Sequence, residues 1–367
     1  MADCHYLFGN FNQLIRLNEE RRQALMTARD DLKQRIINSF NNIKSQLPSV
    51  HELQFQTQGS FIMDTIINPI SEDYDLDYGV YFIGHLSRAQ RPHTKTFHDF
   101  VKLSVESNNP SVLKVIDKDT CVRAMYKEGF NYLFENRSNK LIKGFHVDLP
   151  MYYSNTKKSP DLAHLKDAWV TSDPIEFIEW FEKKVKSGFR AEFLYERKLY
   201  SFQYDSWKEN IRKQDAQLRR IVRYLKAWCD YRCHSNGTDM PCGIILTILA
   251  ADNYSSNGRD DISLRDTLIN IQTALQKEFV CKRPTTPIGE DLLKGYEHKT
   301  YFMGELSSLI DAARQAINEG NEKRACGKWQ AKFGNRFLAP WHATMMKMLL
   351  RLDHQQSLLA MQKVPKC

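Results

Sequence analysis

The sequence has no long apolar run, no internal repeat and no low-complexity segment. A bilayer span needs roughly 18 apolar residues, so we expect no membrane-crossing helix. The first residues, MADCHYLFGNFNQ, lack the basic and apolar regions of a signal peptide. Eight cysteines scattered over 367 residues do not resemble a disulfide framework. These absences together predict a protein of the reducing cytoplasm.

Positive charge is in modest excess, with a formal net charge of +8 at pH 7 and no long block of like charges. This balance fits a phosphate-rich partner, whether a nucleotide, a nucleic acid or an anionic surface. It fits equally a charge that only keeps the protein soluble. Composition therefore leaves both interpretations open.

Apolar patterning predicts a helix, then a sheet, then a helical half. Residues 19–46 have apolar side chains at helical spacing and stop before Pro48. Strands are expected at 52–58, 74–82, 111–117, 120–126 and 140–153. Helices are expected at 174–187, 206–232, 241–254, 263–278, 302–318 and 340–361. This order predicts an α+β fold with domains at 1–170 and 171–367.

Aspartates occupy alternate positions at the start of the strand expected at 74–82. Side chains two residues apart share one face of a strand, so Asp75 and Asp77 are expected to point away from the core together. Like charges at this spacing repel, and a pair of Mg²⁺ ions would turn the repulsion into coordination. Asp148, within HVDLP, is either a structural residue or the third ligand. Asp73, at the mouth of the strand, is expected to be solvated.

The stretch QGSF precedes this strand. Gly59 permits close approach of the backbone, and Ser60 offers a hydroxyl beside the amides of an expected helix start, where a phosphate is favoured. A Gly-Ser pair alone is often a plain turn. The pair gains meaning from the aspartate strand that follows it and from the later Asp148.

These motifs resemble the DNA polymerase β superfamily of nucleotidyltransferases, and within it the bacterial cGAS/DncV-like family, most closely its DncV type. The matching stretches are TQGSFIMDT (57–65), YDLDYG (74–79), HVDLPMYY (146–153), WVTSDPIEFIEWF (169–181), RIVRYLKAWCD (220–230) and KFGNR (332–336). The resemblance implies a polymerase-β-type core sheet with a long N-terminal helix, and a helical lobe across a cleft that holds the active site. It also implies two Mg²⁺ ions, with Mn²⁺ as an alternative, held by Asp75, Asp77 and Asp148.

The resemblance further implies contacts to two nucleotides. The residues that would contact phosphates are Gln58, Gly59, Ser60 and Lys226 at the donor and Arg123 at the acceptor. From spacing alone, Arg219, Arg223 and Lys226 form a basic stripe on one helix face, which either flanks a triphosphate or faces solvent.

Two further places in the chain are compared with the family, one that agrees with it and one that departs from it. Ser172, followed by Asp173 and Pro174, is typical of a helix N-cap with an acidic first turn. In the family these positions line the base pocket, so Ser172 and Asp173 would favour the purines of ATP and GTP. By contrast, Cys242 and Gly243 stand where relatives carry a serine near the donor phosphates, and the amide of Gly243 is the substitute contact.

The implied function is Mg²⁺-dependent synthesis of a purine cyclic dinucleotide, of the cyclic GMP-AMP type, from ATP and GTP. In the family this product is a second messenger of bacterial anti-phage (CBASS) signalling that activates a separate effector protein. A monomer with neither a membrane nor a nucleic-acid partner is expected. The alternatives are a synthase of a cyclic trinucleotide or linear oligoadenylate, and an inactive nucleotide- or RNA-binding relative.

A cysteine pair invites a zinc interpretation. Cys229 and Cys233 lie one helical turn apart, next to His234. Their spacing is not that of a CxxC pair, and free cysteines are commonly small buried side chains. We therefore expect no zinc at this position.

Overall fold

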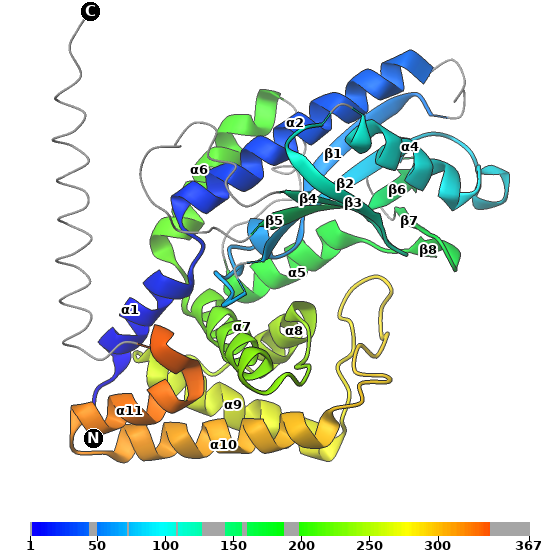
Figure 1. Ribbon diagram of the computed structural model, residues 1–367. Helices are drawn as coiled ribbons and strands as arrows, with labels where there is room; N and C mark the ends of the chain where they lie inside the picture. Colours follow the sequence, from blue (N-terminus) through cyan, green and yellow to red (C-terminus); the bar gives the residue numbers. More distant parts are fainter. Residues whose placement is uncertain are drawn as a thin grey trace, which may run out of the picture.

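A sheet and a layer of helices lie one above the other in the computed structural model of the chain (Figure 1). The structure describes residues 2–43, 50–71, 73–107, 109–126, 144–155, 160–186 and 198–337. The helix expected at 340–361 lies outside these residues. The expected α+β class is confirmed.

Within the described residues the sheet has eight strands: β1 Glu52–Thr57, β2 Tyr74–Ile83, β3 Val112–Asp117, β4 Val122–Tyr126, β5 Phe145–Leu149, β6 Met151–Ser154, β7 Asp161–His164 and β8 Ala168–Thr171. The order is β3-β4-β5-β2-β6-β7-β8, and β1 pairs antiparallel with β2. β2 runs parallel to both β5 and β6. The single strand expected at 140–153 is thus two strands separated by Pro150, because proline has no N–H for a ladder hydrogen bond.

One face of the sheet is covered by α2 (Glu19–Ile43) and α4 (Thr94–Glu106) (Figure 1). Leu32 and Ile36 of α2 are fully buried in the same cluster as Leu76 and Tyr78 of β2. Burial alternates along the first half of β2, with the tyrosines and Leu76 buried and the aspartates between them partly exposed. The predicted alternation is therefore confirmed, and it turns the carboxylates away from the α2 face.

The other helices are α1 His5–Ile15, α3 Gly59–Ile62, α5 Pro174–Val185, α6 Lys198–Gln214, α7 Gln217–Asn236, α8 Gly243–Asn253, α9 Asp260–Lys277, α10 Lys299–Asn318 and α11 Glu322–Phe333. Short 3₁₀ turns lie at Arg88–Gln90 and Gly334–Arg336. Helices α7 to α11 form the second layer (Figure 1). No helix in the described ranges is both long and apolar enough to cross a membrane.

Helix α1 packs into the second layer although it begins the chain. The Phe8 ring lies edge-on to Tyr224 of α7 and Trp329 of α11, and Phe11 packs on Phe333. The domain division at residue 170 stays a prediction. Helix α1 packs with the helical layer, although its residues fall in the first of the two predicted domains. Sequence patterning missed α1, α4, α11, β7 and β8.

The prediction of a single helix at 206–232 is wrong. The stretch is broken into α6 and α7 at Asp215, whose φ is 39°. The Asp215 carboxylate accepts hydrogen bonds from Asn12 at 2.7 Å and from Arg223. These tertiary contacts stabilise a turn that local helix propensity does not predict.

Candidate active site

The turn after β1 is attached directly to β2. Gln58 N donates to Asp77 O at 2.8 Å, and Gly59 follows with a φ of 63°. A Cβ on Gly59 would lie 2.0 Å from Asp77 Oδ2. Glycine is needed here twice, for its positive φ and for the space that the carboxylate occupies. Gly59 therefore brings backbone and carboxylate into direct contact, while its predicted approach to a phosphate stays a prediction.

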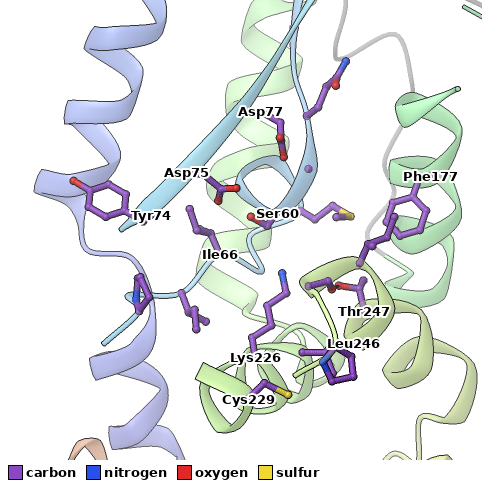
Figure 2. A pocket seen from close by; sticks show the side chains of 18 of the residues that line it. Ser60, Ile66, Tyr74, Asp75, Asp77, Phe177, Lys226, Cys229, Leu246 and Thr247 are labelled. Atoms are coloured by element: carbon purple, nitrogen blue, oxygen red, sulfur yellow. Dashed lines mark hydrogen bonds between the residues drawn. The ribbon is translucent and has the colours of Figure 1, made fainter. Parts of the chain in front are cut away.

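Asp75 and Asp77 line a cavity between the sheet and the helical layer, together with Ser60 (Figure 2). Asp148 on β5 lies in register with Asp77. Burial, reinforced by the charges of Asp75 and Asp148, raises the pKa of Asp77 to about 8. A cation at these oxygens would relieve that electrostatic cost.

Arg123 of β4 donates to both oxygens of Asp148, each at 2.6 Å. Neither residue lines the cavity. Within the described residues, no three histidine, cysteine or acidic side chains are already arranged as a metal site. The structure thus joins Asp75 and Asp77 at the cavity and leaves Asp148 paired to a guanidinium.

Asp73 has a different environment from its two neighbours. Its side chain is 51% exposed and accepts a hydrogen bond from His146 Nδ1 at 2.9 Å. That hydrogen bond lowers the pKa of Asp73. Asp73 is half solvated, as expected, although it also borders the cavity.

The Gln58 side chain is hydrogen-bonded to two stacked tyrosines of the sheet. Its amide nitrogen donates to the Tyr81 hydroxyl at 2.7 Å, and the Tyr152 hydroxyl donates to its carbonyl oxygen at 3.3 Å. Gln58 is only 3% exposed, yet it borders the cavity. Its orientation is therefore set by the sheet before any ligand binds.

Lys226 reaches toward the aspartates from α7 on the opposite side of the cavity (Figure 2). Burial lowers its pKa to about 8, although the charges of Asp75 and Asp77 act in the other direction. A Cβ on Gly243, at the start of α8, would lie 3.2 Å from Lys226 Cε. The missing side chain at residue 243 thus leaves the lysine its path into the cavity.

The cavity has a volume of about 530 Å³, within the range of roughly 300–1,000 Å³ typical of small-molecule sites. Eight of the sequence-predicted site residues line it: Gln58, Gly59, Ser60, Asp75, Asp77, Ser172, Asp173 and Lys226. A paired carboxylate, a glycine turn and a lysine around one cavity can hold a phosphate chain and its counter-ion.

Residues 53–152 match the family described as "Cyclic GMP-AMP synthase DncV-like, nucleotidyltransferase domain". They form a DncV-like nucleotidyltransferase domain. The resemblance read from the motifs is thereby confirmed. The matched stretch contains β1, the Gly59 turn, β2 and β5, and so all three candidate metal aspartates.

Known proteins extend the comparison beyond this domain. A cyclic GMP-AMP synthase of Escherichia albertii is 24% identical over 238 residues, which cover 64% of this chain and 44% of that protein. The chain spans about half the length of the curated relatives it matches. The crystal structure of Vibrio cholerae DncV cyclic AMP-GMP synthase matches with a TM-score of 0.67 and 18% identity, covering 92% of this chain and 98% of that one. The same values hold for DncV in complex with the linear intermediate 5′ pppA(3′,5′)pG. The two structures show a shared fold across both layers.

The basic stripe next to the DncV-like domain is not what its spacing predicts. Arg219 and Arg223 are 1% and 0% exposed, so they face neither solvent nor the cavity. Arg219 forms a buried ion pair with Glu182, and Arg223 pairs with Asp215. Helical spacing correctly placed the three cations on one side of α7, but that side packs against protein. Of these three cations, Lys226 alone lines the cavity.

The cap of α5 is also one residue away from its expected place. The N-cap is Asp173, whose carboxylate accepts from the amides of Ile175 and Glu176 at 3.1 Å each. Ser172 precedes the cap and is not the capping residue. Both residues still line the cavity beside the DncV-like domain.

The cysteine pair belongs to the cavity wall. Cys229 is buried, and burial raises its pKa far above the usual range. Cys233 also lines the cavity and accepts a hydrogen bond from Met240 N at 3.3 Å.

Sequence reasoning missed cavity residues that come from distant segments. Arg283, on the connection between α9 and α10, lines the cavity and donates to Glu290 at 2.7 Å. The same connection is tied to α5, because Thr286 N donates to Glu176 at 2.9 Å. Thr247 of α8 also lines the cavity. No local pattern marks these residues, since only the packing of the helical layer against the domain brings them to the site.

Proposed function

We propose that the chain is a nucleotidyltransferase that makes a purine cyclic dinucleotide, of the cyclic GMP-AMP type, from ATP and GTP. One observation carries the proposal: Asp77 lies against the Gly59 turn, and Asp75 and Asp77 face Lys226 across a single cavity. The DncV-like domain and the names of the relatives support the same activity.

The residues present fit magnesium. Carboxylate oxygens are the ligands that Mg²⁺ and Mn²⁺ prefer, and Asp77 is a carboxylate of raised pKa that lies beside two others and faces Lys226 across the cavity. Asp75 and Asp77 would hold the metal, joined by Asp148 when Arg123 changes partner. Bound there, two such ions would neutralise the charge on the transferred phosphoryl group and its leaving group.

The chain's own side chains have separate tasks in the transfer. Lys226 would exchange its hydrogen bond to Thr65 O, now 3.2 Å, for a donor phosphate oxygen. Gln58, Gly59 and Ser60 would hold the same phosphates from the sheet side. Burial of the site strengthens each of these charged hydrogen bonds.

The acceptor side would be organised by the Arg123–Asp148 pair. An acceptor phosphate would draw Arg123 away from Asp148 and free that carboxylate to orient the attacking hydroxyl. Attack on the donor α-phosphate forms one phosphodiester bond and expels pyrophosphate. A second transfer on the linear product would close the ring. The linear intermediate bound to Vibrio cholerae DncV supports such a two-step course.

The wider setting is part of the same proposal. We propose that Ser172 and Asp173 contact the purine bases, and that the product is a CBASS second messenger which activates a separate effector protein. The enzyme would act as a cytoplasmic monomer.

The test is product formation from nucleotides supplied singly and in pairs. Purified protein with Mg²⁺, ATP and GTP should yield a phosphatase-resistant cyclic dinucleotide, identified by mass and nuclease sensitivity, and EDTA should abolish it. A cyclic trinucleotide or oligoadenylate would overturn the proposed product while keeping the transferase. Tight RNA binding with a steep salt dependence and no nucleotide turnover would overturn the enzyme.

A further inference from the structure

Three consecutive carbonyl oxygens, those of residues 63–65, accept hydrogen bonds from one side of α7. Arg219 donates to the first, Arg223 to the second and Lys226 to the third, the last at 3.2 Å. The donors are spaced i, i+4 and i+7, so they form one row along the helix. A short segment of main chain is thus attached to α7 at every residue.

The two arginines are rigid parts of this attachment. Arg219 also donates to Glu182 of α5 at 2.8 Å, and both side chains are 1% exposed. Arg223 also donates to Asn12 of α1 at 2.9 Å and to Asp215. A guanidinium holds several partners in a fixed plane, which an ammonium does not. Each arginine therefore connects the segment to other helices or turns.

The segment is held from its other side through Asp64. This residue has a φ of 52°, and its carboxylate accepts from Arg22 of α2 at 3.1 Å and from Arg16. Burial disfavours the charge, but the arginines outweigh it and hold the pKa of Asp64 below its usual range. The main chain is thus held by α7, and the Asp64 side chain is held by Arg16 and Arg22, with Arg223 of α7 also within 3.5 Å of it.

Residues 58–65 form one closed unit. Gln58 N donates to Asp77 O at 2.8 Å at one end, and Thr65 N donates back to Ser60 O at 2.9 Å at the other. The first part of the unit borders the cavity, while its last three carbonyls face α7. The position of Ser60 relative to α7, and so to Lys226, is therefore determined by the bonds from Arg219 and Arg223, which remain when Lys226 turns to a phosphate.

We infer that Arg219 and Arg223 are positioning residues: they fix the turn at 58–65 against α7 so that Ser60 and Lys226 meet the same phosphate chain. The phosphate part of this inference rests on the proposed function. The arginines touch no substrate themselves, because neither lines the cavity.

The test compares Arg219→Lys and Arg223→Lys with Arg220→Lys. Lysine keeps the charge but loses the planar fork. Arg220 is a matched control on the same helix, since it makes two 2.7 Å hydrogen bonds to the buried Asp260. It also donates to the Asp215 carbonyl, and it has no described hydrogen bond to residues 58–65. Measurements are hydrogen–deuterium exchange of residues 58–65, the urea midpoint, and kcat and KM for ATP and GTP.

We expect faster exchange at 58–65 and a roughly ten- to hundredfold fall in kcat/KM in both test variants, because small displacements of reacting groups are costly in rate. The Arg220→Lys control should show a similar fall in the urea midpoint. Its exchange rate at residues 58–65 and its kcat/KM should stay within about threefold of wild type. Exchange at 58–65 equal to that of the control would overturn the anchoring. Faster exchange with unchanged kcat/KM would overturn the positioning role. Absence of turnover in the wild type would refute the proposed function instead, and exchange would still decide the anchoring.

Discussion

Replacement of Gly59 by alanine tests the contact on which the site is built. The new Cβ would lie 2.0 Å from Asp77 Oδ2, so the oxygen must retreat by about 1.4 Å to reach the 3.4 Å of an ordinary contact. Misplacement of a reacting group by roughly 1 Å can cost about a hundredfold in rate. The positive φ adds about 1–2 kcal/mol of backbone strain. We expect Gly59→Ala to fold, with slightly lower stability, and to lose at least about a hundredfold in turnover.

The control separates strain from displacement. Gly237, at the C-terminus of α7, has a φ of 66°, and a Cβ added to it would meet nothing within 4 Å. Gly237→Ala should therefore show a similar loss in the free energy of unfolding, measured in urea, with turnover close to wild type. If chromatography shows that Gly59→Ala retains turnover within about threefold of Gly237→Ala, the Asp77 carboxylate does not need its place against the turn, and the reasoning fails.

Three further predictions concern charge. Asp75→Asn combined with Asp77→Asn should abolish the cyclic product yet leave thermal stability equal or higher, because it removes the burial cost and the repulsion that together raise the Asp77 pKa; product from this variant would refute the metal assignment. Lys226→Met should raise the KM for the donor nucleotide about tenfold to a hundredfold in initial-rate assays, as expected for a lost charged hydrogen bond, and an unchanged KM would place the phosphates elsewhere. Asp64 has a lowered pKa, so its stabilising charge is present above the unfolded pKa and is lost as pH falls through the folded value. Urea midpoints of Asp64→Asn should accordingly be lower at neutral pH and fall less steeply than wild type from about pH 5 to 2, and equal slopes would contradict this sign.

Alternation along β2 shows how local chemistry can be predicted. Tyr74, Leu76 and Tyr78 are buried and the aspartates between them are not, because a strand has only two faces and the helix α2 covers one. The turn at Gly59 is also a local feature, because it contacts Asp77 of the strand that follows it. The side-chain period of a strand is dictated by the backbone, and the Gly59–Asp77 contact joins residues within about 20 positions of each other.

The sequence-based prediction for α7 was wrong because it depended on which segment packs against the helix. Arg219 and Arg223 share a helix face with Lys226, but a helical pattern does not reveal whether that face meets solvent, ligand or another segment. The cap of α5 lies at Asp173 and not at Ser172 for a different reason, since both residue types cap helices and the local backbone selects between them. Arg283 reaches the cavity from a segment far beyond Asp77 in the chain, with no motif around it.

The chain's own pattern was enough to predict most of the order of elements, the buried and polar faces of β2, and the family to which residues 53–152 belong. Those properties depend on neighbours along the chain and on motifs of a few residues. Tertiary packing alone determines that two arginines of α7 hold the turn, that Arg123 pairs with Asp148, and that Arg283 of the loop after α9 lines the cavity. The physical reason is that burial, ion pairing and hydrogen bonding are set by residues distant in sequence, which become neighbours when the two layers pack together.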